Sequence, residues 1–167
     1  MSEPTDPTPP RRPQLYGIGT SVYAERDGKI LVLKRAGGAA AGAWYTPGGV
    51  LDPGETPGEC ARRELFEETG LAPSGPLEIV GVIPMHVYGA DGFIVAYAGA
   101  CRDGEVKLSH EHSASRWIDP LEYRDRYFSA AGIEKLRAVE PRIAEMSAAV
   151  RRGIDEYLAW RARRALP

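Results

Sequence analysis

Residues 49–71 read GVLDPGETPGECARRELFEETGL, and this stretch decides how the rest of the chain is interpreted. Glycines dominate its first half, where they let the backbone turn sharply and pass close to a ligand. Thr56 can cap a helix and Glu59 completes a Thr-x-x-Glu capping box, while Gly70 can take the left-handed conformation that ends a helix. The pattern predicts a loop followed by a helix over about residues 57–69.

Three glutamates of this predicted helix share one face. At 100° per residue, Glu64, Glu67 and Glu68 fall within about a 100° arc. Like charges at these spacings disfavour a helix by about a few tenths of a kcal/mol per pair, and a bound hard cation would reverse that cost. Oxygen ligands of this kind suit Mg²⁺ or Mn²⁺ and not Zn²⁺. Arg63, beside Glu64 and four residues from Glu67, can orient carboxylates through charge-assisted hydrogen bonds.

A glutamate-rich helix on its own is more often a solvated ladder of ion pairs than a metal site. The wider spacing changes that interpretation. From Gly49 to Leu71 the chain resembles the Nudix box, G-x5-E-x7-R-E-U-x-E-E-x-G-U with U a bulky aliphatic residue, at every defined position. The resemblance extends to the order of the flanking strands and to Trp117, which follows Glu111-His112 as in many Nudix domains.

The resemblance implies a Nudix fold, an α/β/α sandwich with a mixed β-sheet. It also implies a Mg²⁺- or Mn²⁺-dependent enzyme that hydrolyses a nucleoside diphosphate linked to another moiety. Carried over by position, Glu67 and Glu68 become metal ligands, the Gly49 carbonyl becomes a further ligand and Glu55 supports them. The metal would neutralise the diphosphate and activate water for attack at phosphorus.

The general base has two candidates. Glu64 serves as metal ligand or as base in different Nudix enzymes, and Arg63 would orient it. In some members a glutamate outside the box takes this role, and Glu111 is the candidate here. A lone glutamate before a predicted strand would equally be a surface charge, so the choice stays open.

Candidate substrate contacts lie near the ends of predicted strands. Lys34 and Arg35 end a strand before the glycine-rich loop of residues 36–43 and could meet phosphate, although such basic residues are more often solvated. Four aromatic residues could stack on a base, although in strands they more often belong to the core; they are Trp44, Tyr45, Tyr88 and Phe93. ADP-ribose or another nucleotide sugar, a nucleoside triphosphate and a dinucleoside polyphosphate all remain possible substrates.

Turn dipeptides mark the remaining strands. Asp27-Gly28 joins two β-rich runs and predicts a hairpin. Asp91-Gly92 is expected to form a second turn between two further runs. Residues 106–108 and 115–119 are expected to add short strands as antiparallel partners.

Helical patterns follow Pro120, with a break expected at Pro141 and an amphipathic end from residue 143 to about 162. The expected organisation has three parts. It comprises a disordered proline-rich tail at 1–13, a Nudix domain at 14–127 and a helical extension at 128–167 that packs on the domain or forms a homodimer.

The charge balance excludes several partners. With 21 basic and 23 acidic residues, the chain offers no global attraction for DNA or an anionic membrane. No stretch is apolar enough for a spanning helix or a secretory leader, so a cytoplasmic protein with reduced cysteines is expected. The three histidines show no metal-ligand spacing with either cysteine and are expected to be structural.

Two functions are alternatives to hydrolysis of a small nucleotide derivative. The first is a Nudix fold that senses a nucleotide without turnover, but such members usually lose a box glutamate and this chain keeps all of them. The second is hydrolysis of RNA ends, which the absence of a sizeable basic surface in the sequence disfavours.

Overall fold

The first two strands form the predicted hairpin. In the computed structural model, which describes residues 15–38, 40–87 and 90–165, β1 (Gly17–Arg26) and β2 (Lys29–Arg35) pair antiparallel. The connecting Asp27 and Gly28 have φ angles of 49° and 74°. These positive values match the twist of a two-residue hairpin turn, so the predicted turn is confirmed.

The sheet is mixed, as expected. Its other strands are β3 (Trp44–Tyr45), β4 (Glu78–Val87), β5 (Ala90–Ala100) and β6 (His112–Ile118). β1 runs parallel to β5, and the remaining pairs are antiparallel. β2 pairs with β1 near the turn, with β3 at its far end and with β6 along most of its length.

The segment after β3 lies along β1. The Val22 N–H donates to the Pro47 carbonyl at 2.8 Å, and the Thr20 N–H donates to the Gly49 carbonyl at 2.7 Å. The pairing of β1 with β2 is confined to the residues beside their turn, which leaves this edge of β1 available. The glycine loop of the box is thereby fixed to the sheet by backbone hydrogen bonds.

The expected turn at Asp91-Gly92 is wrong. Both residues belong to β5, opposite His86 and Met85 of β4. Gly92 is required there for another reason: a Cβ at this position would lie 2.5 Å from the Gly17 carbonyl oxygen of the parallel strand β1. The glycine therefore permits close approach of two backbones and does not form a turn.

The expected strand at 106–108 is also absent from the structure. The Lys107 N–H donates to the Thr69 carbonyl and the Ser109 N–H donates to the Glu68 carbonyl. These carbonyls belong to the last turn of the box helix, where intrahelical partners are missing. The segment is therefore fixed to a helix end, and its backbone donors are not available for another strand.

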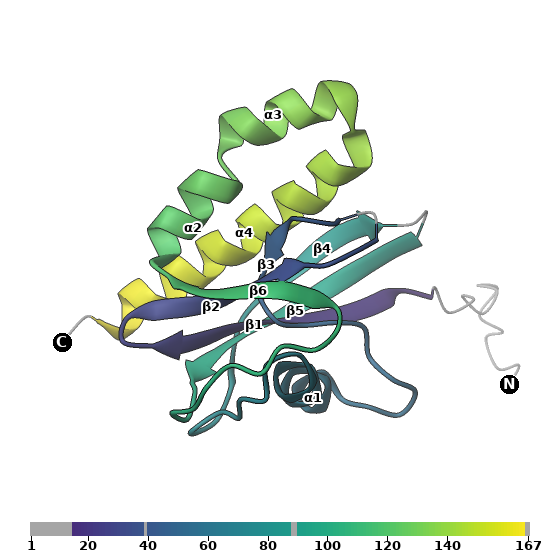
Figure 1. Ribbon diagram of the computed structural model, residues 1–167. Coiled ribbons are helices and arrows are strands. Elements are labelled where there is room, and N and C mark those ends of the chain that lie inside the picture. The colour runs from purple at the N-terminus through teal and green to yellow at the C-terminus, as the bar shows by residue number, and fades with distance from the viewer. Residues whose placement is uncertain (1–14, 39, 88–89, 166–167) are drawn as a thin grey trace, which may run out of the picture.

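Helices cover both faces of the sheet (Figure 1). One face carries α1 (Pro57–Thr69), and the other carries α2 (Pro120–Tyr127), α3 (Ala130–Val139) and α4 (Pro141–Arg164). Leu31 and Leu33 of β2 belong to the core under α1, whereas Ile30 and Val32 belong to the core under the other helices. This alternation gives the expected α/β/α sandwich.

The last helix is locked to the sheet by aromatic contacts. Tyr157 of α4 stacks on Tyr23 of β1 with ring centroids 4.6 Å apart, and its hydroxyl donates to Glu25 at 2.6 Å. Pro141 lies at the first turn of α4, where a proline is favoured, so the expected break is confirmed.

No helix in the part of the chain that the structure describes is long and apolar enough to cross a membrane. The expected tail at 1–13 lies outside the described residues, and the division at residue 128 remains a prediction.

Candidate active site

The box helix has the predicted ends. The Glu59 N–H donates to the Thr56 hydroxyl, and the Glu59 carboxylate accepts from the Thr56 N–H at 2.9 Å, which completes the capping box. Gly70 ends the helix with φ 69°. Because both ends are satisfied, α1 presents its side chains from a rigid frame.

Arg63 joins the carboxylates of the box. Its Nε and Nη2 donate to the two oxygens of Glu55, each at 2.9 Å, which is a bidentate contact. Its Nη1 donates to Glu64 at 2.9 Å and to Glu67 at 3.1 Å. The guanidinium holds the pKa of Glu55 at about 2, well below its usual value. Arg63 thus makes the orienting contacts that its position in the sequence indicated.

Glu64 lies against the backbone of the glycine loop. A Cβ on Gly49 would meet the Glu64 carboxylate at 2.3 Å, so only glycine leaves room for it. Burial raises the pKa of Glu64, Arg63 lowers it, and the charges of Glu67 and Glu111 raise it further. The loop and helix therefore enclose a partly desolvated carboxylate that lies against the Gly49 backbone.

Glu68 is the buried member of the set, with 6% of its surface exposed. The Gly48 N–H donates to its Oε2 at 3.0 Å, and the Nε2 of His112 lies 3.6 Å from its Oε1. Burial raises the pKa of Glu68 to about 7, the Gly48 N–H opposes this rise, and the nearby charges of Glu64 and Glu111 add to it.

The structure also brings His112 to this site, a residue for which the sequence predicts only a structural role. Burial lowers its pKa, so the ring is neutral at physiological pH. The available signal was its place at the start of a strand, directly after Glu111. Nothing local in the sequence indicates that this strand begins beside the end of α1.

Arg35 and Glu111 also meet near the box. The Arg35 Nη1 donates to the Glu111 carboxylate at 2.7 Å, and the Ala36 N–H donates to the Glu111 carbonyl at 2.8 Å. The charge of Glu111 raises the pKa of both Glu64 and Glu68. Both predicted residues therefore lie within electrostatic reach of the box carboxylates.

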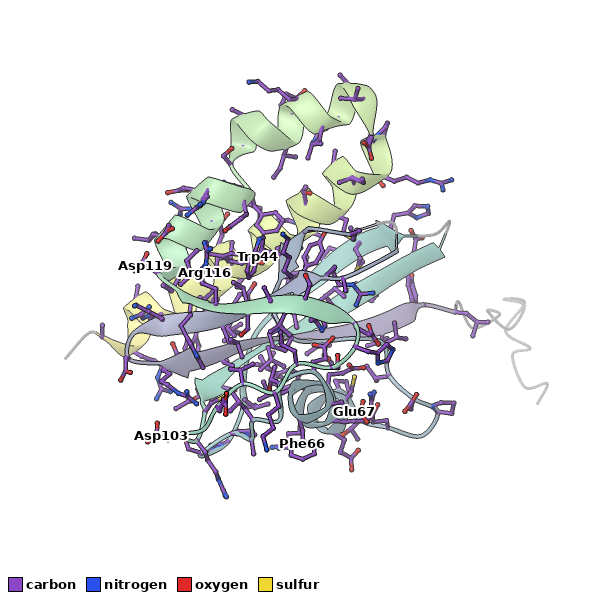
Figure 2. The ribbon with its side chains drawn as sticks, in the orientation of Figure 1. Trp44, Phe66, Glu67, Asp103, Arg116 and Asp119 are labelled. Atoms are coloured by element: carbon purple, nitrogen blue, oxygen red, sulfur yellow. The ribbon has the colours of Figure 1, made fainter. Side chains whose placement is uncertain are left out.

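Other predicted substrate contacts lie elsewhere. Trp44 packs with Arg116, whose guanidinium is 5.1 Å from the ring centroid, on the α2 side of the sheet, whereas Glu67 lies on the α1 side (Figure 2). Tyr45 packs on Phe128, with ring centroids 6.1 Å apart. These contacts favour the core interpretation of both aromatic residues. Two further predicted contacts are Lys34, which pairs with Trp44 and Ala114, and Tyr88, which lies outside the described residues.

A groove of about 600 Å³ opens at the start of β1 and β5. Tyr16 and Phe93, with ring centroids 5.2 Å apart, form part of its wall, and His86 and Asp91 form a hydrogen-bonded pair at 2.8 Å. The same end of β1 holds the box loop along its other edge, since the Leu51 N–H donates to the Ile18 carbonyl. The groove is also lined by Pro141, Glu145 and Arg152 of α4, so it opens on the α4 side of the sheet, whereas α1 with the box carboxylates covers the other side.

The donor set suits a hard cation in its chemistry. The carboxylates supply oxygens, and the Gly49 carbonyl accepts the Thr20 N–H at 2.7 Å and only a weak second contact from the Cys60 Sγ at 3.8 Å, which a cation could replace. Among the described residues, no three acidic, histidine or cysteine side chains already stand close enough together to hold a metal ion. Arg63 and the Gly48 N–H instead occupy carboxylate oxygens that a cation would need, so metal binding requires the glutamate side chains to rearrange.

Comparison with known proteins agrees with this geometry. The family model of the NUDIX domain matches residues 15–138. A MutT-like protein of Streptomyces ambofaciens is 33% identical over 143 residues, covering 84% of this chain and 86% of that protein. A CTP pyrophosphohydrolase of Escherichia coli is 32% identical over 123 residues, covering 68% of this chain and 84% of that protein.

A solved structure supports the same assignment. The solution structure of the E. coli ORF135 protein superposes with a TM-score of 0.67 at 27% identity, covering 92% of this chain and 96% of that chain. The chain therefore belongs to the Nudix hydrolase family.

Proposed function

We propose that this protein is a Mg²⁺- or Mn²⁺-dependent pyrophosphohydrolase that cleaves the diphosphate bond of a small nucleotide derivative. The observation that carries the proposal is the set of box carboxylates gathered by Arg63 beside the glycine loop. Four box glutamates are kept, whereas a protein that only binds nucleotides has no need of them all. They are Glu55, Glu64, Glu67 and Glu68.

Glu64, Glu67, Glu68 and the Gly49 carbonyl are the groups that would hold the cation. When bound, a divalent cation neutralises diphosphate charge and lowers the pKa of water. Without it, the carboxylates would repel a diphosphate. Burial is the main cause of the raised pKa values of Glu64 and Glu68, and the charges of neighbouring carboxylates add to it.

The chain's own residues orient the site and move the proton. Arg63 holds Glu55 by two hydrogen bonds and thereby fixes the loop relative to α1. Either Glu64 or Glu111 accepts the proton of the attacking water. Glu64 is fixed between Arg63 and Gly49, whereas Glu111 is exposed and paired with Arg35. Replacement of each by glutamine identifies the base, because only the base variant loses the limb at low pH, where activity rises as the base is deprotonated.

The substrate class we favour first is a nucleoside triphosphate. The E. coli CTP pyrophosphohydrolase matches along 84% of its own length, which makes CTP the first compound to test. A candidate contact for the base is the Tyr16–Phe93 pair at the start of β1, the strand whose other edge holds the box loop. Arg35, at the end of β2, is placed to meet phosphate once its contact with Glu111 is released.

The test is a panel of CTP, other nucleoside triphosphates, ADP-ribose, a nucleotide sugar and a dinucleoside polyphosphate. Each is incubated with Mg²⁺ and the products are identified by ³¹P NMR. The proposal predicts cleavage within the phosphate chain of at least one compound, and loss of that cleavage in Glu68→Gln. Tight nucleotide binding without turnover of any compound would contradict it and favour a nucleotide sensor.

A further inference from the structure

The two oxygens of the Glu68 carboxylate face groups from two different segments. The Gly48 N–H donates to Oε2 at 3.0 Å from the box loop, and the Nε2 of His112 lies 3.6 Å from Oε1 at the start of β6. Both side chains are buried, with 8% of the Glu68 side chain and 3% of the His112 side chain exposed. Glu67, by contrast, has a side chain that is 57% exposed and is held by Arg63.

The imidazole of His112 is itself fixed relative to α1. The His112 N–H donates to the Ser109 carbonyl, and the Ser109 N–H donates to the Glu68 carbonyl, each at 3.2 Å. The Ser109 hydroxyl lies 3.4 Å from Nδ1 of the ring. This places Nδ1 toward Ser109 and Nε2 toward Glu68, which fits the tautomer that carries its proton on Nε2.

We propose that His112 is a positioning residue that sets the orientation of the Glu68 carboxylate for metal binding. The inference rests on the proposed function, in which Glu68 is a metal ligand. A buried carboxylate has few polar neighbours, so each one strongly restricts its rotation. The Gly48 N–H holds one oxygen by a hydrogen bond, and the Nε2 of His112, 3.6 Å from the other oxygen, reaches hydrogen-bond distance after a small shift of the carboxylate, which leaves the remaining lone pairs for the cation. Groups that hydrogen-bond metal ligands usually contribute about 10–100-fold to metal affinity.

Three substitutions of one residue separate positioning from packing. His112→Gln can place an amide N–H near the position of Nε2, whereas His112→Asn can place one only near Nδ1. His112→Leu keeps volume and removes both. Ser113→Ala is the matched control on the same strand, because the Ser113 hydroxyl faces the Lys34 carbonyl and not Glu68.

Mn²⁺ binding to the full-length protein, followed by electron paramagnetic resonance without substrate, is the primary readout. His112→Leu and His112→Asn should weaken Mn²⁺ binding by about 10–100-fold, and His112→Gln and Ser113→Ala by less than about threefold. The Mg²⁺ concentration that half-activates turnover should shift in the same order. If His112→Leu does not fold, the difference in Mn²⁺ affinity between His112→Asn and His112→Gln still tests the positioning role.

The outcomes separate this inference from the proposed function. Unchanged Mn²⁺ affinity in His112→Leu or His112→Asn, together with loss of binding in Glu68→Gln, would overturn the role of His112 alone. Equal weakening in all three His112 variants would also overturn it, because packing then explains the effect. Absence of Mn²⁺ binding by the wild type would overturn both.

Discussion

The two faces of the sheet are each covered by helix, but they are built from different chemistry. Under α4, the stacked rings of Tyr23 and Tyr157 belong to a core that the structure fills with aliphatic and aromatic side chains. On the α1 side, the helix packs Ala61 and Leu65 inward and turns a set of carboxylates toward the glycine loop. Both helices therefore bury apolar side chains on the sheet, and α1 carries the box carboxylates as well.

The difference teaches where stability and chemistry are located. Burial of apolar surface contributes about 25 cal/mol per Å², so the α4 face is a net source of stability. Burial of a carboxylate such as Glu68 costs free energy unless hydrogen bonds or a cation compensate for it. Substitutions of the box carboxylates should therefore change activity more than stability, and those of side chains buried under α4 should do the reverse.

The largest effect is expected from Glu68→Gln. We expect kcat/KM to fall by more than about 100-fold, because even a group that only supports a metal ligand is worth about 10–100-fold. In EDTA, Tm should stay constant or rise, because the substitution removes a buried carboxylate whose pKa burial raises. Steady-state kinetics and thermal unfolding of the same preparation check both. A Tm that falls by many degrees would mean that Glu68 is mainly structural.

Neighbouring glycines give the next test. Gly49→Ala should lower kcat/KM by about 10- to 100-fold, because its Cβ would displace the Glu64 carboxylate and small misplacements of this kind are costly. Gly48→Ala should instead destabilise the fold by more than about 2 kcal/mol. Its φ is 152° and its Cβ would lie 2.1 Å from the Thr20 carbonyl oxygen.

Chemical denaturation and kinetics of both variants distinguish the two effects. Gly48→Ala should lower the free energy of unfolding more than Gly49→Ala does. Gly49→Ala should show the larger loss of activity per folded molecule. Equal losses of stability in the two variants would contradict the assignment of Gly48 to folding and of Gly49 to the placement of the Glu64 carboxylate.

On the opposite face, Tyr157→Phe should destabilise the protein by about 1–2 kcal/mol, since it removes a hydrogen bond to a charged group. The stacked ring is kept, and kcat/KM should be unchanged at a temperature where the variant is folded. Urea denaturation and steady-state kinetics provide the measurement. A large fall in activity with full stability would show that α4 communicates with the site.

The smallest effect concerns the capping box. Hydrogen bonds from Thr56 hold the pKa of Glu59 below its ordinary value of 4.5. A carboxyl whose folded pKa is depressed adds stability above its unfolded pKa, and that stability is lost as pH falls through the folded value. The Tm difference between wild type and Glu59→Gln should therefore be small and constant near neutrality and should close below about pH 4.5. A gap that widens in acid would contradict this role.

Local signals in the sequence predicted the box helix and the first hairpin because neighbouring residues decide them. Thr56 and Glu59 cap one another, and Asp27-Gly28 needs no distant partner. Asp91-Gly92 was predicted to be a turn because Asp-Gly is a turn signal. Glycine is needed at position 92 because the backbone of the parallel strand β1, far away in sequence, passes too close for a side chain. A turn is decided by neighbouring residues and can be predicted from them, whereas the close approach of two strands depends on residues far apart in sequence.

Within the site, spacing identified the carboxylates, but not the partners that reach them from other segments. Glu64, Glu67 and Arg63 lie on one helix, so their contacts follow from helical periodicity. The approach of His112 to Glu68 depends on how the segment before β6 attaches to the end of α1. Their roles in metal binding and catalysis remain predictions for the experiments above.

The central claim is that the carboxylates on α1 act through a divalent cation. The most direct measurement follows turnover and circular dichroism on one sample, first in Mg²⁺, then after addition of EDTA and then after excess Mg²⁺. The account predicts that EDTA abolishes turnover while the spectrum and Tm of the folded protein persist, and that Mg²⁺ restores turnover. Undiminished turnover in EDTA with the fold intact would contradict it.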